Sequence, residues 1–218
     1  METTSASRIV GRAAFGAACA GTVLGPIHAL SRYATVPEDL ESPLVRVWAE
    51  PATRALQPLL DWSDPDTVYL SYGKLWLFVI AAATAAAFAV RRQRTPSGLE
   101  LWGWRIALPG YVLATVSSFG EYWTPWLDEA FMLLAIPAML ISVAGSTVLG
   151  IALLRRRFKP RATSWLLTAW FPAVVVLSTV ISLGAAVLPM VWAWALAGHR
   201  AVSAPDDTTV DTRERVGR

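Results

Sequence analysis

The chain carries two groups of closely spaced carboxylates, and these side chains have the clearest potential for chemistry. One group lies within residues 61–66 and the other within residues 121–129. Oxygen ligands of this kind bind hard cations such as Ca²⁺ and Mg²⁺. The spacing matches no metal-binding loop motif, so we predict no metal site and interpret most of these acids as solvated loop residues. The acids that we retain as candidate functional residues are Asp64, Asp66, Glu121, Asp128 and Glu129.

Glu121 follows the apolar run 101–119 almost directly. An ionisable side chain at membrane depth is a functional candidate by default. Two interpretations stay open. In the first, Glu121 lines an outward-facing cavity and binds a cation or a polar group. In the second, it lies just above the membrane interface in contact with water.

Arg105 is the other candidate, because it lies one turn inside the same apolar run. A long arginine side chain can extend along apolar surface and place its guanidinium at the membrane surface. The alternative is that Arg105 faces the interior of the protein and pairs with a carboxylate. Glu100 is the nearest carboxylate in the sequence.

Motifs of catalysis and cofactor binding are missing from the sequence. It contains no HExxH, P-loop, GxSxG or dinucleotide-binding pattern. The two histidines, His28 and His199, fall near opposite membrane surfaces in the predicted topology, which argues against a shared haem or metal. The single cysteine, Cys19, has no partner in the chain. We therefore predict no catalytic residue and no cofactor, and a non-enzymatic role is favoured.

The elements that position these residues are apolar runs whose ends alternate between arginine clusters and acidic loops. They cover residues 13–30, 75–90, 101–119 and 131–154. A helix needs about 20 apolar residues to cross the hydrocarbon core, and arginine and lysine stay on the cytoplasmic side. The arginines expected to contact anionic lipid headgroups are Arg91, Arg92, Arg94, Arg155, Arg156 and Arg157.

Composition supports a membrane protein. Of the 218 residues, 55% are hydrophobic and only 16% are charged, against about 25% in soluble domains. The net charge of +3 is explained by arginines beside apolar runs, so we predict no nucleic-acid partner. The preference for arginine over lysine and the high alanine content are typical of a high-GC bacterial genome.

The run 164–197 holds no charged residue and is the hardest part to divide. We split it at a turn over 182–184, which gives two further spans, 162–181 and 185–198. A single long tilted helix is the alternative, and it would place the C-terminus outside. Trp102, Trp104, Trp165, Trp192 and Trp194 are then expected at the cytoplasmic interface.

The longest segment between spans, 31–73, combines acidic residues with apolar residues at helical spacing. We expect short amphipathic helices lying on the outer membrane surface, one of them starting at Pro43. Trp48 and Trp62 would lie at headgroup level. A further helix start at Asp64-Pro65 would run directly into the second span.

Small residues recur every four positions in two spans, and such stripes allow helix backbones to approach closely in lipid. Packing within the chain and a dimer contact both fit this pattern. The stripes consist of Ala13, Ala17, Gly21 and Gly25 in the first span and of Ala138, Ser142, Ser146 and Gly150 in the fourth.

These observations predict an all-α, polytopic integral membrane protein with a six-helix transmembrane bundle, or five helices in the alternative. We expect a cytoplasmic N-terminal segment over residues 1–12, a transmembrane domain over 13–200 and a disordered cytoplasmic tail over 201–218. The expected location is the plasma membrane. The favoured function is association within the membrane, as a homo-oligomer or with another membrane subunit. A small-solute permease and, with less support, an enzyme using the outer carboxylates are the alternatives.

Overall fold

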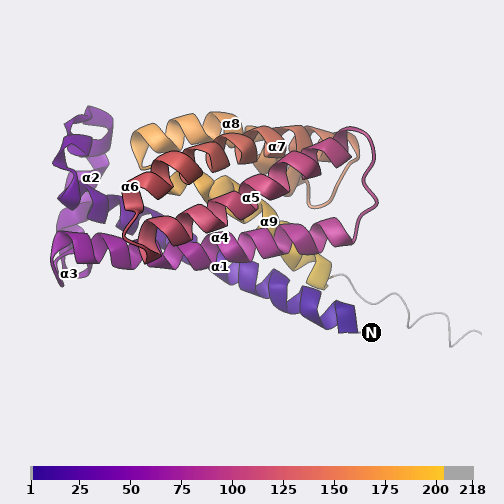
Figure 1. The fold of residues 1–218 in the computed structure, drawn as a ribbon, viewed down its shortest axis with the longest axis horizontal. Helices are drawn as coiled ribbons and strands as arrows, with labels where there is room; N and C mark the ends of the chain where they lie inside the picture. Colours follow the sequence, from indigo (N-terminus) through magenta and orange to yellow (C-terminus); the bar gives the residue numbers. More distant parts are fainter. Residues whose placement is uncertain (1, 204–218) are drawn as a thin grey trace, which may run out of the picture.

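The computed structural model describes residues 2–203, and within this range the chain forms helices and no strand. The long helices lie side by side along one axis (Figure 1): α1 (Glu2–Thr35), α4 (Pro65–Arg92), α5 (Leu99–Trp123), α7 (Ile136–Arg155), α8 (Arg161–Val180) and α9 (Leu188–Ser203). Four stretches are long and apolar enough to cross a membrane: Ala6–Thr35, Pro65–Arg92, Leu127–Arg155 and Arg161–Val180. Most of the tail predicted from residue 201 lies outside the described residues.

The two ends of the bundle differ in character. Helices α4 and α7 end in Arg92 and Arg155 at the same end, which we call the arginine end. At the opposite end, the loop end, three short helices lie across the bundle (Figure 1): η1 (Pro37–Glu41), α2 (Pro43–Ala55) and α3 (Gln57–Leu60). Helix α4 starts at Pro65, as the sequence predicted, and Asp64 caps it by accepting a hydrogen bond of 2.9 Å from the Thr67 amide.

Helix α2 is attached to the bundle by polar and apolar contacts. Val45 and Ala49 are buried on the side of α2 that meets the end of α1. The Trp48 indole donates a hydrogen bond of 2.6 Å to the Val180 carbonyl, and the Tyr33 hydroxyl donates to the Ile181 carbonyl. These two carbonyls lie where α8 ends and lack helical donors of their own, so the indole and the phenol complete the helix terminus.

The start of the chain differs from the prediction. The segment 1–12 was expected to precede the helix of the first span, but α1 begins at Glu2 and includes most of this segment. The last helix supports this early part, because Gly198 of α9 approaches Gly11 so closely that an added Cβ would lie 3.2 Å from the Gly11 Cα atom. Packing against a neighbour stabilises a helix beyond what its local sequence provides.

The uncharged run 164–197 forms two antiparallel helices, α8 and α9, joined by a turn and by the 3₁₀ helix η3 (Ala185–Val187). Two hydrogen bonds hold the pair together. The Thr163 hydroxyl donates to the Ala193 carbonyl at 2.8 Å, and the Trp170 indole donates to the Ala186 carbonyl at 2.6 Å. The alternative of one long helix is therefore wrong for this run.

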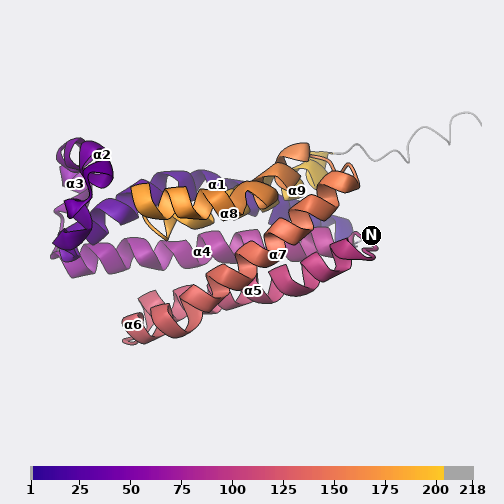
Figure 2. The ribbon, with the colours of Figure 1, turned by 90° about the horizontal axis from the view of Figure 1, so that it is seen from above.

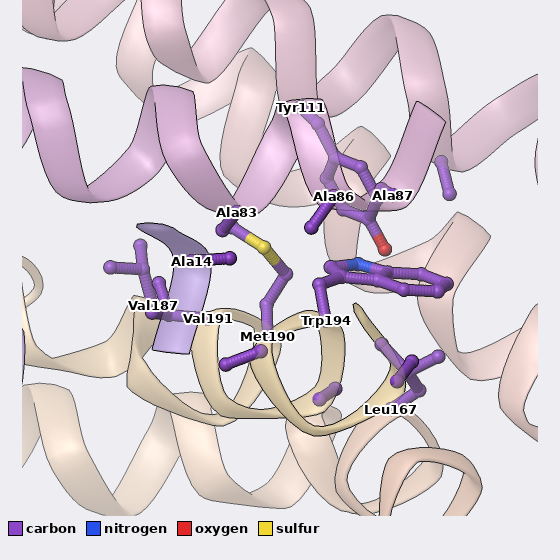
Figure 3. Packing of buried hydrophobic residues seen from close by; sticks show 14 of the residues in the cluster. Ala14, Ala83, Ala86, Ala87, Tyr111, Leu167, Val187, Met190, Val191 and Trp194 are labelled. Carbon is purple, nitrogen blue, oxygen red and sulfur yellow. The ribbon is translucent and has the colours of Figure 1, made fainter. Parts of the chain in front are cut away.

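The arginine half of the bundle is densely filled. Trp104 and Trp194 are each no more than 1% exposed, and their rings lie 5.0 Å apart. Figure 3 shows the Trp194 ring beside Tyr111, with Ala86 and Ala87 of α4 on the same side as the tyrosine. The prediction that Trp104 and Trp194 anchor the protein at a membrane interface is wrong, because both rings are core residues, whereas Trp102 and Trp165 are exposed.

The second stripe of small residues lies inside the chain, on the face of α7 that meets α5 and α8. A Cβ added to Gly145 beside this stripe would lie 2.4 Å from the backbone nitrogen of Ala107, and one added to Gly150 would lie 2.6 Å from that of Thr168. The Tyr111 hydroxyl and the Ser146 hydroxyl are hydrogen-bonded across the α5–α7 contact. Small residues therefore bring these backbones into direct contact.

The first stripe is used only in part. Gly21 and Gly25 are buried and face Trp76 of α4 and Leu188 of α9. Ala17 is half-buried and Ala13 is exposed. The glycines of this stripe thus serve packing within the chain.

Helix α7 is preceded by a widened turn. The short helix α6 (Leu127–Ala130) passes into the π-helical turn η2 (Phe131–Ala135), in which the Ile136 amide donates to the carbonyl of Phe131, five residues back. Pro137 follows and has no amide hydrogen to continue an α-helical ladder. Figure 2 shows α7 and α8 close together at the arginine end and separated at the loop end.

Candidate functional site

A cavity of about 810 Å³ opens in the loop half, where α7 and α8 separate. Pockets that bind small organic molecules range from roughly 300 to 1,000 Å³. Helices α1, α4, α5, α7, α8 and α9 all contribute to its wall, together with η1, α2 and the turn before η3. Its lining includes His28, Arg32, Glu38, Tyr69, Trp76, Ala114, Ser117, Glu121, Tyr122, Asp128 and Ser142.

Glu121 lies in the cavity wall at the end of α5. Its carboxylate accepts a hydrogen bond from the Ser117 hydroxyl one turn earlier. No salt bridge within 4.0 Å is seen for this half-buried carboxylate among the described residues, but Arg32 of the same lining is near enough for its charge to act on it. Glu121 therefore lies in the wall of a cavity, as the first interpretation requires.

Aromatic rings surround the position where α1, α4 and α5 meet. The His28 ring is stacked on Tyr69 with 4.8 Å between centroids, and it meets Tyr122 edge-on at 5.5 Å. The hydroxyls of Tyr69 and Tyr122 lie 3.5 Å apart. Gly73 makes room for this arrangement, because a Cβ there would overlap the Tyr122 ring, 2.1 Å from Cδ1. His28 is thus a buried aromatic wall residue, far from His199, which contacts Phe15.

Three lining residues carry buried polar atoms that have no hydrogen-bond partner among the described residues. They are the Nε2 atom of His28, the Nε1 atom of Trp76 and the Oγ atom of Ser142. The three residues are at most 4% exposed. A buried polar atom without a partner costs about 1–3 kcal/mol. Two further atoms of this kind, the Oγ atom of Ser164 and the Nε1 atom of Trp194, lie outside the lining, so three of the five such atoms among the described residues belong to the cavity wall.

The cavity reaches far into the bundle and is closed below. Ser142 lies opposite Gly110, since a Cβ on Gly110 would lie 2.6 Å from the Ser142 Oγ atom. Gly110 is eleven residues before Glu121 on α5, which corresponds to a depth of about 16 Å at 1.5 Å per residue. Toward the arginine end from this level, Trp104, Leu149 and Trp194 are buried in the core.

A buried ion-pair cluster joins the helices at the arginine end. The side chain of Glu100 is 0% exposed and binds the Arg94 guanidinium through two hydrogen bonds of 2.6 and 3.0 Å. A nitrogen of Arg156 lies 3.1 Å from the same carboxylate, and Arg156 also donates to Ser97. The Trp104 indole donates a further hydrogen bond of 3.4 Å. The cluster ties α5, the end of α7 and the loop after α4 together.

Sequence reasoning did not identify this cluster. Arg94 and Arg156 were expected to contact lipid headgroups, but each has a carboxylate partner within the chain. Glu100 was considered only as a partner for Arg105. Arg105 is exposed, and its guanidinium lies over the Trp102 ring at 5.2 Å. Arg94 lies six residues before Glu100, and Arg156 lies more than fifty residues after it. This spacing matches no sequence motif.

The remaining predicted acids separate into two groups. Asp128 is exposed and contributes to the mouth of the cavity beside Glu121, whereas Glu129 is exposed and outside the lining. Asp64 and Asp66 are exposed at the start of α4. Among the described residues no group of three or more metal-ligating side chains comes together. His28 and Trp76 were not predicted as lining residues, and Ser142 was predicted only as a packing residue; for His28, an ionisable side chain within an apolar span was the signal that could have identified it.

Comparison with known proteins adds no relatives. No protein-family model matches the chain, and no curated protein or solved structure matches it either.

Proposed function

We propose that this chain is a small-molecule permease of the plasma membrane, or the membrane subunit of one, with its binding cavity open to the outside. The observation that carries the proposal is the cavity, deep and lined by unpartnered polar atoms at the loop end, above a closed arginine end. In this proposal the arginine end faces the cytoplasm, as the positive-inside rule favours. All six long helices cross the membrane, and η1, α2 and α3 lie at the outer surface.

The two halves of the bundle support an alternating mechanism. A permease exposes one site to each side of the membrane in turn, by movement of one group of helices against another. The cavity corresponds to the outward-open state. Opening toward the cytoplasm would require the Glu100 cluster to break, because it bridges α5, α7 and the loop between α4 and α5.

Association within the membrane receives less support. Gly21 and Gly25, which were expected to provide a contact surface, already face Trp76 and Leu188 of the same chain. The stripe on α7 is likewise covered by α5 and α8.

Cysteine accessibility tests the proposal. In a Cys19→Ser background, Ala114→Cys places a thiol in the cavity wall, and Val112→Cys places one on the exposed face of the same helix. We expect a charged, membrane-impermeant thiol reagent to label residue 114 from outside intact cells, while residue 112 is shielded by lipid. In inverted vesicles, labelling of residue 114 should be slow and should rise when Glu100→Gln is added.

The outcomes separate the functions. If residue 114 is not labelled from outside, no outward cavity exists and the proposal fails. If it is labelled from outside but never from inside, even with Glu100→Gln, the site belongs to a receptor or binding protein and not to a permease.

A further inference from the structure

We propose that the cavity binds organic cations: amines or quaternary ammonium compounds with an apolar body and a hydrogen-bonding oxygen. This inference rests on the proposed binding function and names its ligand class. It is carried by three features of the lining, namely the charge at the mouth, the aromatic wall and the unpartnered polar atoms.

Negative charge dominates the lining. Three carboxylates, Glu38, Glu121 and Asp128, line the cavity against one arginine, Arg32. Glu121 is half-buried whereas Glu38 and Asp128 are exposed, and it accepts a hydrogen bond from Ser117. Arg32 acts on Glu121 but leaves an excess of two negative charges in the lining, so a cationic ligand is favoured over an anion.

Aromatic residues provide the second feature. Tyr69, Trp76 and Tyr122 line the cavity around His28. The faces of such rings attract organic cations through their quadrupoles, and this attraction is the usual basis for recognition of quaternary ammonium groups. The carboxylate of Glu121 adjoins Tyr122 in sequence, so the charge and the rings lie in the same part of the wall.

The unpartnered polar atoms describe the body of the ligand. An indole nitrogen donates hydrogen bonds and accepts none, so the Trp76 Nε1 atom needs an acceptor. The Ser142 hydroxyl can donate to the same acceptor, and so can the Nε2 atom of His28 in the tautomer that carries a hydrogen there. A ligand with an ether, hydroxyl or carbonyl oxygen meets these requirements, and Met139 and Met190 of the lining contact its apolar part.

A pair of isosteric probes tests this assignment. Phenyltrimethylammonium and tert-butylbenzene have the same shape and differ in one unit of charge. Binding of each is measured by calorimetry with the full chain in a nonionic maltoside detergent. We expect the cation to bind at least tenfold more tightly than the neutral probe. Glu121→Gln should remove this preference, and Glu129→Gln, which changes an exposed carboxylate outside the lining, should keep it.

Each result decides the inference. Equal affinity for the two probes in the wild-type protein overturns it, and so does a cation preference that survives Glu121→Gln. Failure of the cation to bind at all also overturns it. The labelling of residue 114 is measured independently of any ligand, so an outward cavity that is labelled but prefers no cation refutes the ligand class and leaves the proposed function standing.

Discussion

The contact between α5 and α7 predicts opposite effects for two glycine substitutions of the same kind. A Cβ added at Gly145 would lie 2.4 Å from the Ala107 nitrogen, 2.6 Å from the Ala107 Cα atom and 2.8 Å from the Ile106 carbonyl carbon. All three are backbone atoms, so no side chain can rotate away. Since ordinary contacts of a Cβ atom begin near 3.4 Å, Gly145→Ala must push the two helices apart.

The cost has two parts. Overpacking of a tightly packed core costs about 1–3 kcal/mol. Separation of α5 and α7 also weakens the buried hydrogen bond between Tyr111 and Ser146, which contributes about 0.5–1.5 kcal/mol. We expect Gly145→Ala to lower the free energy of unfolding by about 2–4 kcal/mol.

Gly16 is the matched control. It lies in α1, and a Cβ added there would meet no atom within 4 Å. Alanine is the better helix former by roughly 0.5–1 kcal/mol, so Gly16→Ala should leave stability unchanged or raise it slightly. Thermal unfolding followed by circular dichroism in detergent measures both variants. Equal melting temperatures for wild type and Gly145→Ala, or an equal loss in both variants, would refute the direct backbone contact.

Two further predictions concern charged groups. The buried Glu100 carboxylate destabilises the protein only when no cation is paired with it. The Arg94→Gln/Arg156→Gln double variant should therefore have a lower melting temperature than Glu100→Gln, and adding Glu100→Gln to the double variant should restore part of the lost stability. A triple variant that melts at a lower temperature than the double variant would contradict this reasoning. Hydrogen bonds from Thr67 lower the pKa of Asp64, so the cap on α4 stabilises the helix start above the unfolded pKa of about 3.9 and is lost as pH falls through the lower folded pKa. In the wild type, hydrogen exchange at the Thr67 amide, corrected for its intrinsic pH dependence, should therefore accelerate in acid. Asparagine can cap the helix but does not titrate, so Asp64→Asn is the control. The same acceleration in Asp64→Asn would exclude Asp64 as the cause.

Local signals explain what could be predicted from the sequence. Proline after a capping residue marked the starts of α2 and α4, and both helices begin at the predicted residues. The glycine-containing turn at 182–184 divides α8 from α9 as expected. Each signal acts within a few residues, and such signals keep their meaning in any fold.

Tertiary partners explain what could not be predicted. Trp102 and Trp104 are two residues apart, yet the first is 58% exposed and the second 1%. Neither hydropathy nor spacing distinguishes them, because the choice depends on which face of α5 meets Trp194 and the Glu100 cluster. The roles of Arg94 and Arg156 likewise depend on tertiary structure, because both arginines pair with one buried carboxylate, that of Glu100.

The cavity has a local cause that is visible in the sequence once the fold is known. Pro137 has no amide hydrogen for the helical ladder, and the preceding turn widens into η2. Phe131, Met132 and Ala135 of this turn line the cavity. About three turns further along the chain, the small residues Gly145 and Gly150 allow the backbone of α7 to contact the backbones of α5 and α8, respectively. One helix thus combines a widened, proline-associated end with a smooth, small-residue end. The open half and the closed half of the bundle follow from this difference, because α7 meets α8 closely only where its side chains are small.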